Sequence, residues 1–434
     1  MDNKRQNSLK DHRQIGQEQE LFFIHEYAPS AIFWLPKGWI IYQQLVQFIR
    51  EKIIDEGYQE ISTPVMIRNA LFKKSGHWEH FGEHNMFNLA ILEDEEIAEI
   101  TRDPQAAEKA GIIDLINGMI NPRVNYSLKP MNCPEAALVF AHKPRSYKEL
   151  PLKLSEFGVL HRRELSGVLG GLLRVRQFMI DDAHLFVRPD QIMEEIHKLL
   201  ALVMDFYKSL GFEPRFYLAT KPDKAMGDPE MWNVAERDLE EALKQTNVTY
   251  RIKEKDGAFY GPKIDAHIKD SQGRDWQLAT IQLDFMMPER MELEYIDSKG
   301  QQIRPVMIHR GIFGSVERFI GMLIEHFQGA FPVWLAPVQV VLIPIAERHN
   351  TAAQQALETM RSAGLRAELD DRNESMQAKI RNHTLQKVPY MAIMGDREIQ
   401  GGSVSVRTRS GEDLGAISLE QFVRKVKNEI ERKV

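Results

Sequence analysis

The densest concentration of residues that could do chemistry is the run HRRELSGVLGGLLRVRQFMIDDAHLF, residues 161–186. Arginines such as Arg162 and Arg174 are suited to bidentate contacts with phosphate. The paired glycines between them allow a loop to lie close to a ligand. A hairpin with a solvated, charged tip gives the same pattern, so the run alone leaves both interpretations open.

A second run, GSVERFIGMLIEHF, places Glu317 and Arg318 at the start of a helix predicted to begin near Ser315. An acidic residue close to the positive end of the helix dipole is an ordinary feature. By itself, this run favours an ordinary amphipathic helix.

Possible metal ligands are scattered. Cys133 is the only cysteine, and His184 and His309 lie far from it in the sequence. A single cysteine is more often a small buried apolar residue. Spacing alone is therefore weak support for a metal site.

Composition narrows the class of protein. With 434 residues, 43% of them hydrophobic, the chain is long enough for two or three domains with buried cores. It has no apolar run of membrane-spanning length, and its first residues lack the apolar stretch of a secretory signal. One cysteine cannot form an internal disulfide, so we expect a cytoplasmic protein without a membrane span. A net charge of −6 neither indicates nor excludes RNA binding.

The elements that must position these residues fall into two groups. Up to about residue 335 we expect helices over 39–56 and about 190–210. We also expect a strand over 58–67, interrupted at Pro64, and many short strands, including separate ones at RVRQFMI and AHLFV. Residues 90–122 are predicted to be a partly helical insertion. This pattern indicates an antiparallel sheet with helices against it.

After about Leu335 the pattern becomes an alternation of strands and helices. VQVVLIPIA, LRAELDD and YMAIMGD are predicted strands, separated by helices over 350–363 and 375–387. A further strand, SVSVRTR, and a helix over 418–432 follow. We therefore expect two domains, 1–335 and a small α/β domain over 336–434.

Together with YQEISTPVM, the two runs resemble the three signature motifs of class II aminoacyl-tRNA synthetases. Longer phrases, among them GHWEHF, KPMNCP, AFYGPKIDA, TIQLDF and WLAPVQVV, resemble threonyl-tRNA synthetases over about residues 11–430, apart from the insertion. The resemblance implies an α+β fold: a class II catalytic domain, with an antiparallel sheet flanked by helices, followed by a small α/β anticodon-binding domain. It also implies a homodimeric threonine–tRNA ligase that uses ATP, L-threonine and tRNA(Thr).

The family's zinc ligands match Cys133, His184 and His309. Three protein ligands leave a coordination position open, as in catalytic zinc sites. We therefore expect one Zn²⁺ per subunit, with Mg²⁺ accompanying ATP.

The resemblance also implies a set of substrate contacts. Arg162 is expected to hold the α-phosphate, Arg174 and Arg318 the distal phosphates, and Phe178 to stack on adenine. The expected catalytic residues are Arg162, Arg318 and Lys263. The expected ATP-binding residues are Arg162, Glu164, Arg174, Phe178, Gln277 and Arg318. The expected threonine-binding residues are Met131, Asp182, Tyr260, Lys263, Gln282 and Ser315.

In the C-terminal domain, the positions that read the anticodon in the family match Asn373, Arg381, Lys387, Glu398 and Arg407, with lysine at 387 where arginine is common. Hydrogen bonding and guanidinium stacking on unpaired bases suit these residue types. A solvated charged surface is the alternative interpretation.

The chain departs from the family pattern in three further places. Only some ten residues precede the matching segment, so we expect a short form without the N-terminal editing region. Ile180 stands where glutamine is usual, and Glu135-Ala136 where Gly-His is common. A regulatory paralogue and an enzyme that charges a carrier other than tRNA are the alternatives. The intact motif residues disfavour the first, and the anticodon-binding domain disfavours the second.

Overall fold

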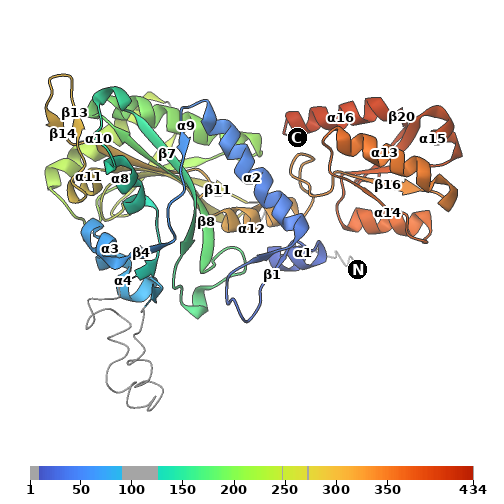
Figure 1. Ribbon diagram of the computed structural model, residues 1–434, viewed down its shortest axis with the longest axis horizontal. Coiled ribbons are helices and arrows are strands. Elements are labelled where there is room, and N and C mark those ends of the chain that lie inside the picture. Colours follow the sequence, from blue (N-terminus) through green and yellow to red (C-terminus); the bar gives the residue numbers. More distant parts are fainter. Residues whose placement is uncertain (1–8, 90–125, 247, 271–272, 434) are drawn as a thin grey trace, which may run out of the picture.

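The computed structural model describes residues 9–89, 126–246, 248–270 and 273–433, and most of its strands belong to two large sheets (Figure 1). The predicted insertion at about 90–122 lies outside these residues. No helix in the described ranges is both long and apolar enough to cross a membrane.

The first sheet has eight strands in the order β10-β9-β11-β12-β15-β8-β7-β3. Its inner pairs are antiparallel, and only the two outermost pairs, β10–β9 and β3–β7, are parallel. The strands are β3 (Gln59–Glu60), β7 (Leu152–His161), β8 (Gln177–Val187), β9 (Arg215–Ala219), β10 (Tyr250–Lys253), β11 (Lys263–Lys269), β12 (Asp275–Asp284) and β15 (Val306–Gly311).

One face of this sheet is covered by helices. These are α2 (Pro36–Ile54), α9 (Ile192–Ser209), α10 (Pro229–Gln245) and α12 (Val316–Phe327). Alternate strand residues such as Leu185 and Ile308 join the helices in the largest apolar core. Because side chains alternate along a strand, the neighbouring residues, His184 and His309, point to the other face.

Shorter elements border that other face. They are α3 (Asn69–Ser75), α4 (His77–Asn85), α8 (Cys133–Ala141), α11 (Met286–Arg290) and a small sheet of β4 (Met66–Arg68), β6 (Tyr126–Leu128) and β5 (Asn88–Leu89). Cys133 and Phe140 of α8 pack with Phe186 and Met307 of the sheet in a second apolar cluster. This packing places the start of α8 beside β8 and β15.

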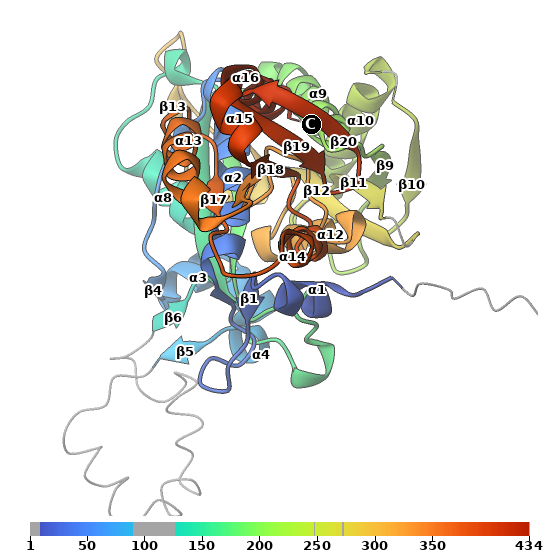
Figure 2. The same cartoon turned by 90° about the vertical axis from the view of Figure 1, so that its right-hand side faces the viewer.

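The second large sheet has the order β17-β16-β18-β19-β20. Its strands are β16 (Val340–Pro344), β17 (Ala367–Leu369), β18 (Tyr390–Met394), β19 (Ser403–Thr408) and β20 (Asp413–Ser418), and its helices are α13 (Asn350–Ser362), α14 (Met376–Leu385), α15 (Asp396–Gly401) and α16 (Leu419–Glu431). Helices α13 and α16 pack on one face and α14 on the other. Figure 2 shows the molecule with the domain of this second sheet facing the viewer.

Helix α1 (His12–Glu18) lies against α12, as Figures 1 and 2 show. It also meets the second sheet's domain, where Gln386 Nε2 donates to the Glu18 carbonyl at 2.8 Å. The remaining short elements are the ribbons β1 (Phe22–Phe23)–β2 (Phe33–Trp34) and β13 (Tyr295–Ile296)–β14 (Gln302–Ile303), and the 3₁₀ turns η1 (Tyr147–Glu149), η2 (Ser166–Val168), η3 (Pro189–Gln191) and η4 (Glu347–His349).

The predicted α2, α9, α12, α13, α14 and α16 are confirmed, with ends shifted by a few residues. The prediction of two separate strands around Asp181 and Asp182 is wrong, because β8 runs unbroken from Gln177 to Val187. Helices α8 and α10 were not predicted from the sequence. For α10 there was a local signal, because Asp228 caps the helix by accepting from the Glu230 amide and Pro229 stands in its first turn.

Candidate active site

Three side chains that could ligate a metal meet on the face of the first sheet away from the four covering helices. One donor atom each of Cys133, His184 and His309 lies within 4.8 Å of the others, and all three residues are buried. His309 is paired with His184 across strands β15 and β8, and their rings cross at 82° with centroids 4.9 Å apart. Cys133 joins them from the first turn of α8. The fold thus brings together three potential metal ligands whose spacing in the sequence gave only weak support for a metal site.

The surroundings of this trio suit a metal. Asp284 Oδ2 lies 2.8 Å from His309 Nε2, which leaves Nδ1 as the ring nitrogen free to bind. A carboxylate that orients a histidine in this way is typical of metal-ligating histidines. Burial lowers the pKa of His184 and raises the pKa of the Cys133 thiol. A cation would stabilise the thiolate that this burial otherwise disfavours.

Three of the six residues expected to bind threonine lie around the trio. Asp182 Oδ2 accepts from Asn132 Nδ2 at 3.1 Å and lies 3.8 Å from His184 Nε2, and burial raises the pKa of Asp182 to about 7. The Tyr260 ring lies 5.1 Å from that of His309, and its hydroxyl donates to Gln282 Oε1 at 2.5 Å. Gln282 is in turn paired with His309 between strands β12 and β15.

Two others, Lys263 and Ser315, make intramolecular contacts nearby. Lys263 Nζ donates to Asp265 Oδ2 at 2.7 Å, and Lys263 is paired with Gln282 across β11 and β12. The Ser315 hydroxyl caps α12 and lies 3.1 Å from Glu317 Oε2. Met131, the remaining predicted contact, packs partly buried beside the Cys133 cluster.

The predicted phosphate-binding arginines form a coupled group. Arg174 makes an ion pair with Glu164 at 2.8 Å, and Arg318 Nε donates to the Leu173 carbonyl at 3.1 Å. Burial lowers the pKa of Arg162, Glu164 opposes that shift, and the positive charge of Arg318 adds to it. Burial and the charge of Arg174 likewise lower the pKa of Arg318. A polyanion placed among these guanidinium groups would relieve their repulsion.

The predicted adenine platform lies beside this group. Phe178 is buried next to Leu160 and Val175, and the Arg162 guanidinium lies 5.2 Å from its ring centroid. The Glu317 carboxylate accepts from the Met179 amide at 3.1 Å, which ties the start of α12 to this strand. Gln277 lies exposed on β12, in the same sheet.

Sequence reasoning gave no role to the residues that hold this site together. Asp181, on the helix-covered face of β8, accepts from the Ile312 and Phe313 amides and from Arg310, which fixes the turn into α12. Asp284 orients His309, and His77 Nε2 lies 3.3 Å from Cys133 Sγ. The phrase GHWEHF was a signal for His77, but nothing in the sequence pointed to the pairing of Asp181 with Arg310.

The five residues expected to read the anticodon all lie in the second domain, exposed or partly exposed. Arg381 lies on α14, and Lys387 follows that helix with a φ of +59°. Glu398, on α15, accepts from the Gly395 amide at 3.0 Å. Asn373 follows β17, and Arg407 lies on β19.

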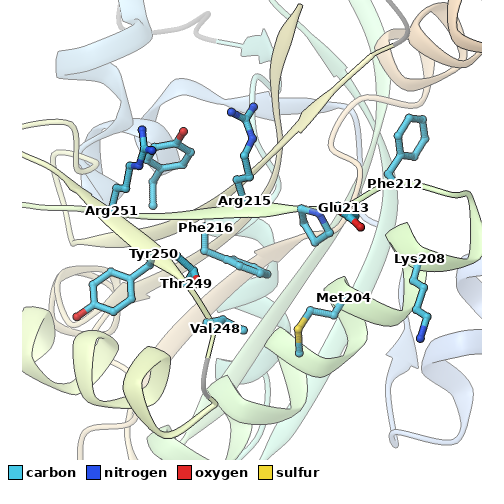
Figure 3. Close-up of a pocket in the computed structure, with 12 residues that line it drawn as sticks. Met204, Lys208, Phe212, Glu213, Arg215, Phe216, Val248, Thr249, Tyr250 and Arg251 are labelled. Carbon is cyan, nitrogen blue, oxygen red and sulfur yellow. The ribbon is translucent and has the colours of Figure 1, made fainter. Parts of the chain in front are cut away.

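A hollow of about 510 Å³ lies apart from all of these residues (Figure 3). It opens between the end of α9 and the strands β9 and β10 at one edge of the sheet, and its lining includes Met204, Phe216, Val248, Arg215 and Arg251. It shares no residue with the predicted site.

Comparison with known proteins decides the family. Residues 119–327 match the tRNA synthetase class II core domain (G, H, P, S and T), and residues 339–429 match an anticodon-binding domain. A solved structure described as the RNA-binding domain of threonyl-tRNA synthetase from Cryptosporidium parvum Iowa II is 35% identical, with a TM-score of 0.87, covering 97% of this chain and 98% of that one. The chain belongs to the threonyl-tRNA synthetase family. The predicted class II fold with an anticodon-binding domain is thereby confirmed.

Curated relatives agree with this assignment. A threonine–tRNA ligase from Caldanaerobacter subterraneus subsp. tengcongensis is 50% identical over 424 residues, and one from Carboxydothermus hydrogenoformans is 48% identical. Each alignment covers 98% of this chain but only 61% and 62%, respectively, of the relative. The chain therefore spans about three fifths of the length of these relatives.

Proposed function

We propose that this threonyl-tRNA synthetase family member is a threonine–tRNA ligase that activates L-threonine with ATP and transfers it to the 3′ end of tRNA(Thr). The observation that supports this most is the closeness of two sites on one sheet face. Arg162, from the arginine group, donates from Nε to the Pro130 carbonyl at 3.3 Å, three residues before Cys133 of the metal-ligand trio. An amino acid held by the trio would present its carboxylate towards the phosphates of ATP.

In this proposal one Zn²⁺ is held by Cys133, His184 and His309, and when bound it would take up the amino and hydroxyl groups of threonine. The Asp182 carboxylate would accept from the amino group, with Tyr260 beside it. Met131, Lys263, Gln282 and Ser315 complete the pocket. Because zinc has no colour or redox signal of its own, metal analysis of the purified protein is the direct check.

Adenylate formation then needs positioning and positive charge rather than a protein nucleophile. The threonine carboxylate attacks the α-phosphorus, and Arg162 stabilises the charge that develops there. Arg174 and Arg318 hold the leaving pyrophosphate, whose charge Mg²⁺ would also neutralise when bound with ATP. Phe178 stacks on adenine, and Glu164, Gln277 and Lys263 contact the remaining polar edges of the substrates.

The proposed activity can be tested without tRNA. Purified protein should exchange pyrophosphate into ATP in a reaction that depends on L-threonine. No exchange above background by a folded, zinc-loaded protein would overturn the proposal. Exchange that depends on another amino acid would keep the reaction class and overturn the substrate.

We further propose a domain boundary near Leu335, with tRNA affinity supplied by the C-terminal part through Asn373, Arg381, Lys387, Glu398 and Arg407. Removing residues 336–434 should then spare pyrophosphate exchange but reduce tRNA charging sharply, because the deleted residues include none of those assigned to the chemistry. Pyrophosphate exchange and tRNA charging by the truncated chain are compared with those of the full chain, and the folding of the truncated chain is checked by circular dichroism. An equal loss of both activities in a folded truncation would contradict the boundary.

We propose a homodimer formed around β3, the edge strand of the large sheet. Large apolar side chains are exposed close to it in the sequence, with Ile54 68% and Met66 52% accessible. Exposed sheet edges and apolar patches favour association. If the protein in solution has the mass of a single chain at micromolar concentration, the dimer is refuted. We also propose that this enzyme is located in the cytosol.

Ile180 gives a prediction about the efficiency of activation. It lies on β8, forms a bridge with Ser315, and packs partly buried against the Phe178 cluster. A glutamine there could donate to the adenylate, and a hydrogen bond to a charged group contributes roughly 1.5–3 kcal/mol. We therefore expect Ile180→Gln to raise the single-turnover rate of adenylate formation about tenfold.

The matched control for this variant is Ile180→Met, which keeps the volume but cannot donate, and it should leave the rate unchanged. A slower Ile180→Gln enzyme with its metal intact would show instead that the pocket is fitted to isoleucine and that the buried amide is unpaired.

A further inference from the structure

Helix α1 contributes one side chain to the loop that carries the predicted phosphate-binding residues. His12 is buried, with 3% of its surface accessible, and its Nε2 accepts from the Leu172 amide at 3.0 Å. On its other side, His12 Nδ1 lies 2.6 Å from Glu325 Oε1 in α12, which also accepts from the His12 amide at 3.0 Å. Since the Leu172 amide is a donor, Nε2 carries no proton and Nδ1 donates to the carboxylate.

The carboxylate that orients His12 is itself held firmly. Glu325 is buried and makes an ion pair with Arg274, whose Nε donates to Asp270 at 2.6 Å. Burial raises the pKa of Glu325, but the hydrogen bonds from His12 and Arg274 outweigh it and hold the pKa below its usual value. The carboxylate therefore stays charged and keeps His12 in the tautomer that the loop amide requires.

The loop is thus attached to α12 at two consecutive residues. The Leu172 amide binds His12, which is bonded to Glu325, and the Leu173 carbonyl accepts from Arg318 at the other end of the same helix. Arg174, paired with Glu164, is the next residue along. Fixing the backbone at 172 and 173 therefore helps to position the two guanidinium groups predicted to bind the distal phosphates, those of Arg174 and Arg318.

Close packing at glycines shows that this arrangement leaves little room for movement. A Cβ atom built on Gly171, where φ is +57°, would lie 2.2 Å from His12 Nε2. One on Gly321 of α12 would lie 2.9 Å from Leu172 Cβ. Both glycines are required for the loop, α1 and α12 to approach as they do.

We infer that His12 is a positioning residue for ATP binding, which acts by holding the 172–174 backbone so that Arg174 and Arg318 receive the distal phosphates. The inference rests on the proposed function, because it takes the roles of these arginines from it. His12 touches no substrate itself. Its effect is expected on nucleotides that carry β- and γ-phosphates and not on AMP.

Two amide substitutions separate the bonds of His12, because asparagine places its amide near Nδ1 and glutamine places its amide near Nε2. His12→Asn keeps the bond to Glu325 but leaves the buried Leu172 amide unpaired, and we expect ATP affinity to fall about tenfold or more. His12→Gln restores an acceptor for Leu172 and should recover most of that loss. AMP affinity should be unchanged in both variants, as measured by calorimetry on the full chain.

His349 in the second domain provides a matched control. It is also buried, accepts from a backbone amide at 3.2 Å and meets a carboxylate, Asp396, at 3.0 Å. His349→Asn should cost stability without changing the affinity for ATP. Equal ATP affinity in the wild-type and His12→Asn chains would overturn the inference, and so would a parallel loss of ATP and AMP. A wild-type chain that binds neither nucleotide would overturn the proposed function instead.

Discussion

Replacing Cys133 by alanine should abolish both metal binding and threonine activation. The wild-type chain is expected to hold about one zinc per chain, because three buried donors lie within 4.8 Å of one another and leave a position open for substrate. Loss of a partner outside the ligand set costs roughly 10- to 100-fold in metal affinity or activity, so loss of a ligand should exceed about a hundredfold. Metal analysis and threonine-dependent pyrophosphate exchange measure the two effects.

Asp284 provides a graded version of the same experiment. Its Oδ1 accepts from the Met286 and Met287 amides while Oδ2 meets His309. Asp284→Asn keeps the acceptor for those amides but offers His309 a donor in place of a carboxylate, which favours the wrong tautomer. We expect zinc affinity to fall about 10- to 100-fold. His326→Gln, a change outside the trio, is the control and should leave zinc affinity unchanged. For the first experiment, full zinc occupancy in the Cys133→Ala variant would refute the proposed metal site.

The amino acid preference should be steep against valine and shallow against serine. Valine has nearly the shape of threonine but lacks the hydroxyl, and a site built to bind a hydroxyl rejects such an analogue by about 10⁴- to 10⁵-fold. Serine keeps the hydroxyl and lacks one methyl group, which changes specificity only about 10- to 200-fold. Measured kcat/KM values in pyrophosphate exchange for the three amino acids test this order.

The polar groups around the trio explain why the shape of the substrate side chain alone does not determine which amino acid is activated. Tyr260 and Gln282 are bonded to each other, and Asp182 lies partly buried beside His184, so an apolar side chain would leave polar groups without a partner. Valine activated within about a hundredfold of threonine would contradict a hydroxyl-binding metal. Serine rejected as strongly as valine would place the specificity in a methyl-binding pocket instead.

Local patterns predicted the elements whose signals lie within one stretch of sequence. Helix α12 has Ser315 as its cap and a continuous apolar face, and β16 is an uninterrupted apolar run. Helix α2 was predicted from its periodicity, although it ends at Ile54 rather than at Gly57. These features need no information about distant residues.

The predictions failed where distant contacts override the local pattern. The sequence predicts separate strands on either side of Asp181 and Asp182, but Asp181 is satisfied by Arg310 and two amides from the turn before α12, so β8 continues through it. The metal trio depends on the register that pairs His184 with His309. No spacing within the sequence fixes that register, and the candidate ligands came from the resemblance to the family rather than from their pattern.

Charging of tRNA tests the central claim most directly. Purified chain, ATP, Mg²⁺ and unmodified tRNA(Thr) should yield threonine esterified to the terminal ribose, with omission of ATP or substitution of Cys133 by alanine eliminating the product. A tRNA of another specificity serves as the control and should remain uncharged. Threonyl-adenylate formed without any transfer to tRNA(Thr), by a folded and zinc-loaded chain, would contradict the proposal that this protein is a threonine–tRNA ligase.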